Sequence, residues 1–360
     1  MLGDSMSFNE FKYKFKSTIQ QIKMLKPADA KDNKIKNIDS VCIVLVNVGI
    51  GDAIMATSFI HTLKKMNKIV DIVLAKKNVD IFSENLDIRN CFLVGDANIC
   101  KIKYDLVVDP YSHCGWFFSY KYYSLLNKMN YIYLSGFNVK APKKYSDNFI
   151  ASDGIHITDY YNHILKKFFN NTVSGQYIVN IPTNEQEKAK QLLENTPVSS
   201  LKIAFCPFAS TQERSFSDEQ VNRILSELNK IKDISIIILC EEHRMKHINL
   251  TGNSYFYKTR SFLSSAAILS LCDFCVSSDT SFVHLANSKD IPLLAFYSSV
   301  YNDGFNTDFL CAPNYKKSKQ IIEPTGIKNI KVDDIVNAII AEIKQYYRID
   351  GVNNSCKREI

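Results

Sequence analysis

The chain has 360 residues, of which 46% are hydrophobic and 22% are charged. This length suits about two to three domains of ordinary size, and the composition excludes a disordered chain because it supplies enough apolar material for ordinary cores. The formal net charge of +7 is compatible with an anionic substrate, an acidic membrane surface or nucleic acid, and by itself selects none of them.

The sequence favours a protein of the reducing cytoplasm. No segment approaches the ~18 uncharged apolar residues of a membrane helix, and the N-terminus lacks the apolar core of a signal peptide. Most of the ten cysteines lie in apolar, strand-like runs, where cysteine usually behaves as a small buried hydrophobe. Cys272 and Cys275 have metal or redox spacing, but no second pair accompanies them, so we interpret them as structural.

Residues 1–38 are polar and lysine-rich, with apolar side chains three and four positions apart. This spacing predicts an amphipathic helix with a basic face. Two interpretations stay open: the helix packs on the body of the protein, or it rests on an anionic bilayer surface. Its apolar residues are Phe8, Phe11, Phe15, Ile19, Ile22 and Leu25.

From residue 40, near-continuous apolar runs alternate with stretches of helical spacing. Such runs are typical of parallel strands that are covered on both faces. A helix follows the first run, because Met55, Phe59 and Leu63 fall on one stripe. The strands predicted here are 41–46, 70–75, 91–95, 104–109 and 131–136.

The pattern loosens over residues 140–200, and a second alternating series follows it. Two successive doubly wound α/β units predict two facing Rossmann-like domains, whose ligands bind outside the carboxyl ends of the strands. The strands predicted in the second series are 202–208, 234–240, 273–278 and 292–297. The helices predicted from residue 140 onward are 159–169, 184–195, 218–230, 262–271 and 332–347. We therefore expect an extension at 1–38, domains at 39–185 and 186–345, and a tail at 346–360.

The turn after the first strand reads "NVGIGDAI". Gly49 and Gly51 resemble a dinucleotide-binding turn, but Ile54 takes the third glycine position and Asp52 would repel a pyrophosphate. An NAD(P)-dependent oxidoreductase is therefore the less favoured alternative. A carboxylate at the end of a strand can instead accept a proton from an incoming hydroxyl, and burial against apolar walls would raise its pKa toward the working range. We predict that Asp52 is a general base and that the glycines let an acceptor approach the backbone.

Polar loops follow three strands of the second series. In "VSSDTSFVHLANS", Asp279, Thr280 and Ser281 are good N-cap residues, and the N–H groups of a helix start form a ready phosphate site. His284 comes one turn later.

In "ASTQERSFS", Ser210 and Thr211 offer hydroxyls and Arg214 offers a bidentate phosphate donor. After "IIILC", Glu241 or Glu242 could accept hydrogen bonds from ribose hydroxyls. Together the loops suit a nucleoside diphosphate.

Two other groups of residues invite functional interpretations. The stretch 109–126 is dense in aromatic residues: it is a helix packed on the first sheet, or else Asp109, His113 and Trp116 line the acceptor side. We expect no nucleic-acid partner, because no RNA-binding or helix-turn-helix motif accompanies its interleaved lysines and tyrosines. We also expect no metal site at His243 and His247, which lack a third ligand and the His-Glu-x-x-His order.

These motifs resemble glycosyltransferase family 9, the heptosyltransferase-like enzymes that build the lipopolysaccharide core. The likeness spans about residues 40–345 and implies the GT-B architecture. The matching stretches are "GDAIMATSFIHTLKK" at 51–65, "PFASTQERSFSDEQ" at 207–220 and "SSDTSFVHLANSKDIPLLAFY" at 277–297.

The resemblance implies a role for each matching residue. Asp52 takes the place of the catalytic aspartate, and Arg214 that of the basic residue, commonly lysine, that faces the donor phosphates. Glu242, or less favourably Glu241, takes the place of the acidic residue that holds the donor ribose. The phosphate loop falls on Asp279, Thr280, Ser281 and His284. Ser281 and Phe282 depart from the family's glycine and its small or proline residue.

The implied reaction is an inverting transfer from a nucleotide sugar, typically ADP-heptose, to a lipid-linked glycan acceptor at the inner face of the cytoplasmic membrane. The acceptor would be lipopolysaccharide core or a similar surface glycan. The sequence has no Asp-x-Asp triplet, so we expect metal-independent catalysis without a cofactor. A non-catalytic nucleotide-sugar-binding relative is the alternative, against which the intact Asp52 argues.

Overall fold

The computed structural model describes residues 16, 19, 37–46, 48–110, 116–139, 144–152, 154–173, 175–194, 196–197, 200–299, 301–302 and 305–347. The chain divides into two compact units, Met1–Ser174 and Gly175–Ile360. The amphipathic helix expected within residues 1–38 lies outside the described residues, apart from Lys16 and Ile19, which are helical.

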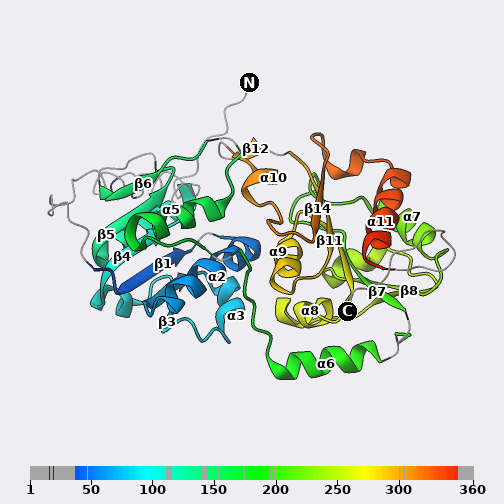
Figure 1. The fold of residues 1–360 in the computed structure, drawn as a ribbon, viewed down its shortest axis with the longest axis horizontal. Coiled ribbons are helices and arrows are strands. Elements are labelled where there is room, and N and C mark those ends of the chain that lie inside the picture. Colours follow the sequence, from blue (N-terminus) through cyan, green and yellow to red (C-terminus); the bar gives the residue numbers. More distant parts are fainter. Residues whose placement is uncertain are drawn as a thin grey trace. The chain divides into compact units, whose positions relative to one another are not determined.

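The first unit contains a six-stranded parallel sheet in the order β3-β2-β1-β4-β5-β6 (Figure 1). Its strands are β1 (Ser40–Leu45), β2 (Ile69–Leu74), β3 (Asn90–Leu93), β4 (Lys103–Asp109), β5 (Asn130–Phe137) and β6 (Asp147–Phe149). The central strand β1 pairs with β2 and β4 and is almost wholly buried, as its continuous apolar run predicts.

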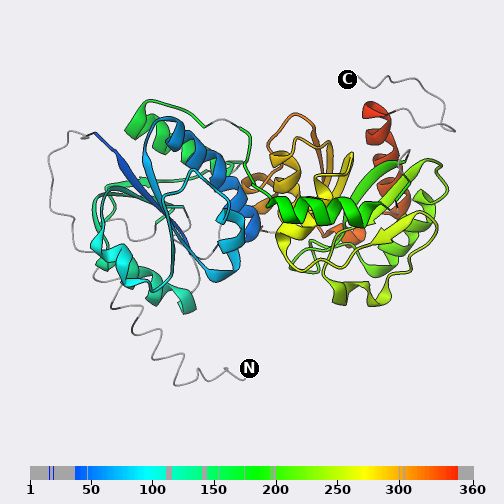
Figure 2. The same ribbon diagram turned by 90° about the horizontal axis from the view of Figure 1, so that it is seen from below.

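Helices cover both faces of this sheet (Figure 2). They are α2 (Ile50–Lys65), α3 (Val79–Phe82), α4 (Trp116–Lys128) and α5 (Ile157–Phe169), with short 3-10 turns at Lys76–Asn78 (η1) and Ala97–Lys101 (η2). On one face α2 contacts α5, where the rings of Phe59 and Tyr161 stack with their centroids 5.0 Å apart. On the other face α4 contributes Tyr122, Leu125 and Leu126 to the core.

The second unit contains a second six-stranded parallel sheet, in the order β14-β11-β10-β7-β8-β9. Its strands are β7 (Leu201–Cys206), β8 (Ile234–Ile238), β9 (Ser254–Phe256), β10 (Phe274–Ser278), β11 (Leu293–Tyr297) and β14 (Ser318–Ile322). A two-stranded antiparallel ribbon, β12 (Tyr301–Asn302) and β13 (Phe305–Asn306), follows β11 in the chain.

The helices of the second unit are α6 (Thr183–Leu193), α7 (Asp218–Leu228), α8 (Phe262–Leu269), α9 (Ser281–Ser288), α10 (Thr307–Leu310) and α11 (Val332–Tyr346), with 3-10 turns at Glu242–His247 (η4) and Ile327–Asn329 (η5). α7 and α11 pack on each other and on the strands, while α6 packs on α8 (Figure 1). Helix α7 begins at a capping box in which Ser217 and Gln220 bond each other's backbone N–H groups.

Both sheets are doubly wound and parallel, as the alternating runs predicted. The strands that the sequence did not reveal are short or lie at the edges of the sheets: β6, β9, β12, β13 and β14. No described helix combines the length and the apolar character that crossing a bilayer requires.

Candidate active site

The second sheet has a topological switch point between β7 and β10. From β7 the chain proceeds to β8 and β9 on one side, whereas from β10 it proceeds to β11 and β14 on the other. Crevices at such points, outside the carboxyl ends of the strands, are the usual ligand sites of open α/β sheets. The loops that carry the predicted phosphate-binding residues follow β7 and β10, so this switch point is the candidate donor site.

An ion pair joins these two loops. Arg214, after β7, places Nη1 3.2 Å from Oδ2 of Asp279, after β10. The Nη2 of Arg214 also donates to Oγ of Ser210 at 2.5 Å. The Asp279 side chain is 5% exposed, so the guanidinium neutralises a carboxylate that would otherwise oppose an anionic ligand here. The structure thus brings three predicted donor-site residues together.

Ser215 shapes the loop after β7, a role that the sequence analysis did not identify. Its buried hydroxyl donates to the carbonyl of Thr211 at 2.7 Å and accepts from the N–H of Ala209 at 2.9 Å. These bonds tie the loop into a turn that presents Ser210 and Thr211 at the surface. A serine in a polar loop gives no sequence signal for this role.

Helix α9 begins where the phosphate loop was predicted. Thr280 is its N-cap and accepts a hydrogen bond from the N–H of Phe282 at 3.2 Å. The helix start carries a partial positive charge and suits an anion. Phe282, which replaces a small or proline residue of the family's loop, packs its ring 5.7 Å from that of Phe262 at the start of α8.

His284 lies inside the unit rather than at its surface. It is 3% exposed, and its ring lies edge-on to the ring of Tyr177 at a centroid distance of 5.9 Å. Tyr177 belongs to the segment that precedes α6, and its backbone N–H donates to Oδ1 of Asn287 on α9. His284 therefore lies at the junction of α9 with this segment.

The predicted ribose-binding residue lies on the loop after β8. Glu242 is exposed and pairs with Lys258 at 2.8 Å, whereas Glu241 pairs with His243 at 3.3 Å. On the same loop, Arg244 places its guanidinium 4.2 Å from the ring centroid of Phe208, which follows β7. This cation–π contact was not predicted from the sequence.

The first sheet has its own switch point, between β1 and β4. The loop after β1 leads into α2, and Asp52 lies in the first turn of that helix, next to Gly51. Oδ2 of Asp52 accepts a hydrogen bond from the N–H of Gly49 at 2.8 Å. Asp52 is half-buried.

Of the residues predicted on the acceptor side, the structure describes the side chain of Asp109 but not those of His113 and Trp116. Asp109, at the carboxyl end of β4, is fully buried, and its Oδ2 accepts a 2.5 Å hydrogen bond from the hydroxyl of Tyr145. Burial and the neighbouring carboxylate raise the pKa of that Tyr145 hydroxyl well above its usual value. Trp116 begins α4, but its side chain is outside the described residues, as is the whole of His113.

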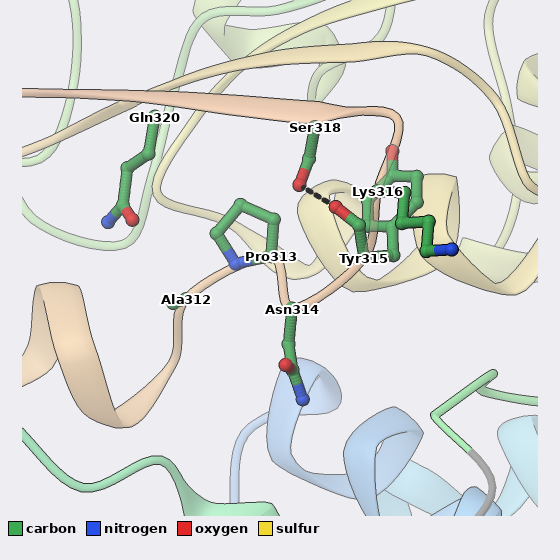
Figure 3. A pocket seen from close by; sticks show the side chains of 7 residues that line it. All are labelled: Ala312, Pro313, Asn314, Tyr315, Lys316, Ser318 and Gln320. Atoms are coloured by element: carbon green, nitrogen blue, oxygen red, sulfur yellow. Dashed lines mark hydrogen bonds between the residues drawn. The ribbon is translucent and has the colours of Figure 1, made fainter.

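A hollow of about 470 Å³ lies elsewhere in the second unit (Figure 3). The residues that line the hollow belong to β14 and to the segment before it. The hollow therefore lies toward the amino end of β14, away from the loops after β7 and β10. Several polar groups in its lining already bond within the protein. Tyr315 donates to the carbonyl of Ile291, Ser318 to that of Tyr315 and Gln320 to that of Asp308.

Within the described ranges, no three or more His, Cys, Asp or Glu side chains gather closely enough to hold a metal ion. Cys272 and Cys275 are free, buried thiols. Burial raises the pKa of the Cys272 thiol well above its usual value, which makes it a poor nucleophile.

Comparison with known proteins shows what this chain is similar to. The sequence profile of glycosyltransferase family 9 (heptosyltransferase) matches residues 156–324. A protein of Escherichia coli (strain K12), provisionally named lipopolysaccharide heptosyltransferase 4, is 23% identical over 330 residues, which are 85% of this chain and 90% of that protein.

Solved structures of the family share the fold. A family 9 glycosyltransferase from Veillonella parvula DSM 2008 aligns with a TM-score of 0.69 at 13% identity, over 86% of this chain and 98% of that one. The E. coli heptosyltransferase WaaC with ADP aligns with a TM-score of 0.64 at 14% identity, over 84% of this chain and 99% of that one. The predicted fold class and the family resemblance are confirmed.

Proposed function

We propose that the chain, which matches the family 9 profile over residues 156–324 and resembles a heptosyltransferase of E. coli, transfers heptose from ADP-heptose to a hydroxyl of the lipopolysaccharide core or a similar surface glycan. The observation that carries this proposal is the ion pair between Arg214 and Asp279 beside the start of α9. It provides a cation and a helix start at one switch point, where a diphosphate would bind. The ADP bound to WaaC supports the choice of nucleotide.

The proposed reaction inverts the anomeric carbon. Asp52 takes the proton of the acceptor hydroxyl as that oxygen attacks the sugar, while the bond from the anomeric carbon to the diphosphate oxygen breaks. Arg214 and the start of α9, with Thr280 and Ser281, stabilise the negative charge on the leaving ADP. These fixed charges and dipoles take the role that a metal ion has in other glycosyltransferases, so the reaction is metal-independent.

The remaining donor contacts follow from the loops after β7 and β8. Ser210 and Thr211 are exposed hydroxyls that can bond phosphate oxygens, and Glu242 can accept from the ribose. His284 is buried behind the start of α9, so we propose that it supports the phosphate loop from within the unit. On the acceptor side, we assign Gly51 to leaving room next to Asp52, and we propose that His113 and Trp116 contact the acceptor.

We propose that the protein works at the inner face of the cytoplasmic membrane, where it would reach the sugars of a lipid-linked acceptor. The basic residues of 1–38 would bind anionic lipid there. Sedimentation of the full chain with vesicles of phosphatidylglycerol and phosphatidylcholine tests this. Binding that disappears when residues 1–38 are removed supports a peripheral location, and equal binding without them contradicts it.

A transfer assay tests the reaction. ADP-heptose and heptose-free lipopolysaccharide are supplied with EDTA, ADP release is followed, and the anomeric configuration of the product is read by NMR. The proposal expects turnover in EDTA, a product of inverted configuration, and loss of transfer in Asp52→Ala with ADP binding retained. Transfer by Asp52→Ala at the wild-type rate would contradict the assignment of Asp52 as the base. Binding of UDP or GDP in preference to ADP would contradict the assignment of ADP-heptose as the donor.

A further inference from the structure

Asn78 connects the turn after β2 to the turn after β1. It ends the 3-10 turn η1, is fully buried, and donates through Nδ2 to the carbonyl of Val48 at 3.0 Å. The two turns are neighbours because β1 and β2 pair in parallel along their full length, ending at Leu45 opposite Leu74. Asn78 is thus a tether that reaches from one strand end to the next.

The carbonyl that Asn78 binds belongs to the peptide group that also contacts Asp52. The oxygen of Val48 and the N–H of Gly49 are the two ends of one planar peptide. At one end the oxygen accepts from Asn78 at 3.0 Å, and at the other the N–H donates to Oδ2 of Asp52 at 2.8 Å. The two hydrogen bonds therefore form a continuous chain from the Asn78 amide, through one peptide, to the Asp52 carboxylate.

Such a chain has two physical effects. A hydrogen bond to a carbonyl polarises the peptide, which makes its N–H a stronger donor to the carboxylate. Two bonds at opposite ends also fix the plane of the peptide, and hence the direction from which the N–H meets Oδ2. The site is tight, because a Cβ built on Gly49 would lie only 3.2 Å from Oδ2 of Asp52.

We propose that Asn78 is a positioning residue for Asp52, acting through the Val48–Gly49 peptide. This inference rests on the proposed function, in which Asp52 removes the proton of the acceptor. A side chain with a hydrogen-bond donor at this reach satisfies the carbonyl of Val48, whereas a carboxylate there would oppose one acceptor with another. The Oδ1 of Asn78 is buried without a hydrogen-bond partner in the described part of the chain, so the donor bond to Val48 is the polar contact that this side chain supplies.

The chain offers a matched control in Asn253. This residue also donates through Nδ2 to a backbone carbonyl, that of Ile234 at 2.6 Å, and its Oδ1 is also buried without a partner among the described residues. It precedes β9 and therefore lies at the amino end of the second sheet, opposite the end that carries the loops after β7 and β10. Loss of the Asn253 amide should reproduce the structural cost of losing Asn78 without its effect on the base.

The test compares Asn78→Ala, Asn253→Ala and Asp52→Ala in full chains. Initial rates of ADP release from ADP-heptose, with heptose-free lipopolysaccharide as the acceptor, give kcat and the donor KM, and Tm is measured alongside. Because one hydrogen bond that orients the base is lost, kcat of Asn78→Ala should fall about tenfold while the donor KM stays within about twofold. Asn253→Ala should lower Tm by a similar amount and keep kcat within about twofold.

Any other outcome contradicts either the positioning role of Asn78 or the assignment of Asp52 as the base. If Asp52→Ala abolishes transfer but Asn78→Ala keeps the wild-type kcat, the positioning role is wrong and the proposed function stands. If both asparagine variants lose kcat equally, Asn78 acts only through stability. If Asp52→Ala transfers at the wild-type rate, the assigned base falls, and this inference with it. Should Asn78→Ala fail to fold, Asn78→Ser, whose hydroxyl is too short to reach Val48, gives the same comparison.

Discussion

The guanidinium of Arg214 lies 3.2 Å from the carboxylate of Asp279, and this pair joins the two loops that flank the switch point of the second sheet. Its partners are not equally exposed: the arginine side chain is 26% exposed and the aspartate 5%. The exposed part of the guanidinium can therefore meet a ligand while Asp279 holds it in place. In the proposed donor site, the pair would orient a cation before the donor binds, which lowers the entropic cost of binding.

Two substitutions of Arg214 should distinguish the contribution of its positive charge from that of its guanidinium geometry. Arg214→Ala removes the cation that we assign to the donor phosphates, together with its ion pair to the buried Asp279, so we expect kcat/KM for ADP-heptose to fall about a hundredfold or more. Arg214→Lys keeps the charge without the bidentate fork and should give an intermediate loss. Steady-state kinetics and calorimetry with ADP measure both. Arg223→Ala, an exposed arginine paired with Asp333, is the control and should change neither.

Glu242 and Glu241 can be distinguished by the same calorimetry. Glu242→Gln removes the carboxylate that we assign to the ribose hydroxyls, and the loss of a charge-assisted hydrogen bond should weaken ADP binding about tenfold. Glu241→Gln is the matched control on the neighbouring residue and should leave ADP binding unchanged. The opposite ranking would transfer the ribose contact to Glu241.

Gly49 should be sensitive to a single added methyl group. Its backbone has φ −71° and ψ 172°, which an alanine adopts without strain, but the new Cβ would lie 3.2 Å from Oδ2 of Asp52. Gly49→Ala should therefore displace the carboxylate by a few tenths of an ångström and lower kcat about tenfold. The donor KM should stay close to the wild-type value, because the donor loops belong to the second unit. A raised KM at constant kcat would contradict this explanation.

The buried pair of Tyr145 and Asp109 should contribute to stability. Tyr145→Phe leaves the Asp109 carboxylate without its 2.5 Å hydrogen bond, and we expect about 1–3 kcal/mol less free energy of unfolding for the first unit. Tyr131→Phe is a matched control, because the Tyr131 hydroxyl is buried without a hydrogen-bond partner within the described residues. It should be neutral or slightly stabilising. Urea denaturation measures both, and equal losses would assign the effect to packing instead.

The sequence predicted the central strands and the start of α9 because both depend on local signals. Continuous apolar runs mark β1, β7 and β10, and the N-cap residue Thr280 marks the start of α9. The edge strands β6 and β9 have three residues each, too few for a periodic signal. Asn78 could not be identified, because its partner Val48 lies 30 residues away and only the pairing of β1 with β2 brings them together. The burial of Asp109 depends likewise on Tyr145, which is 36 residues distant.

The stability of the first unit should depend on Asp147 at acid pH. This carboxylate, at the start of the edge strand β6, accepts hydrogen bonds from Lys167 and His163 on α5 and from Ser135 on β5 at 2.7 Å. Burial alone would raise its pKa, but the bonds from Lys167, Ser135 and His163 outweigh burial and hold the pKa below its usual value of 3.8. The native state therefore favours the ionised form, so this interaction stabilises the fold above about pH 3.8 and is lost as the pH falls through the lower pKa of the folded protein.

The expected signature is a pH-dependent difference between the wild type and Asp147→Asn. The Asn variant should have the lower Tm at neutral pH, because Lys167 and His163 then face a neutral amide. The difference should begin to shrink as the pH falls below about 3.8, and it should be lost once the pH is below the lower pKa of the folded protein, where the native carboxylate is also neutral. Asp333→Asn, whose native side chain is 80% exposed, is the control and should show little difference at any pH. A gap for Asp147→Asn that stays constant down to pH ~2 would mean that packing, and not the carboxylate charge, holds β6 against α5.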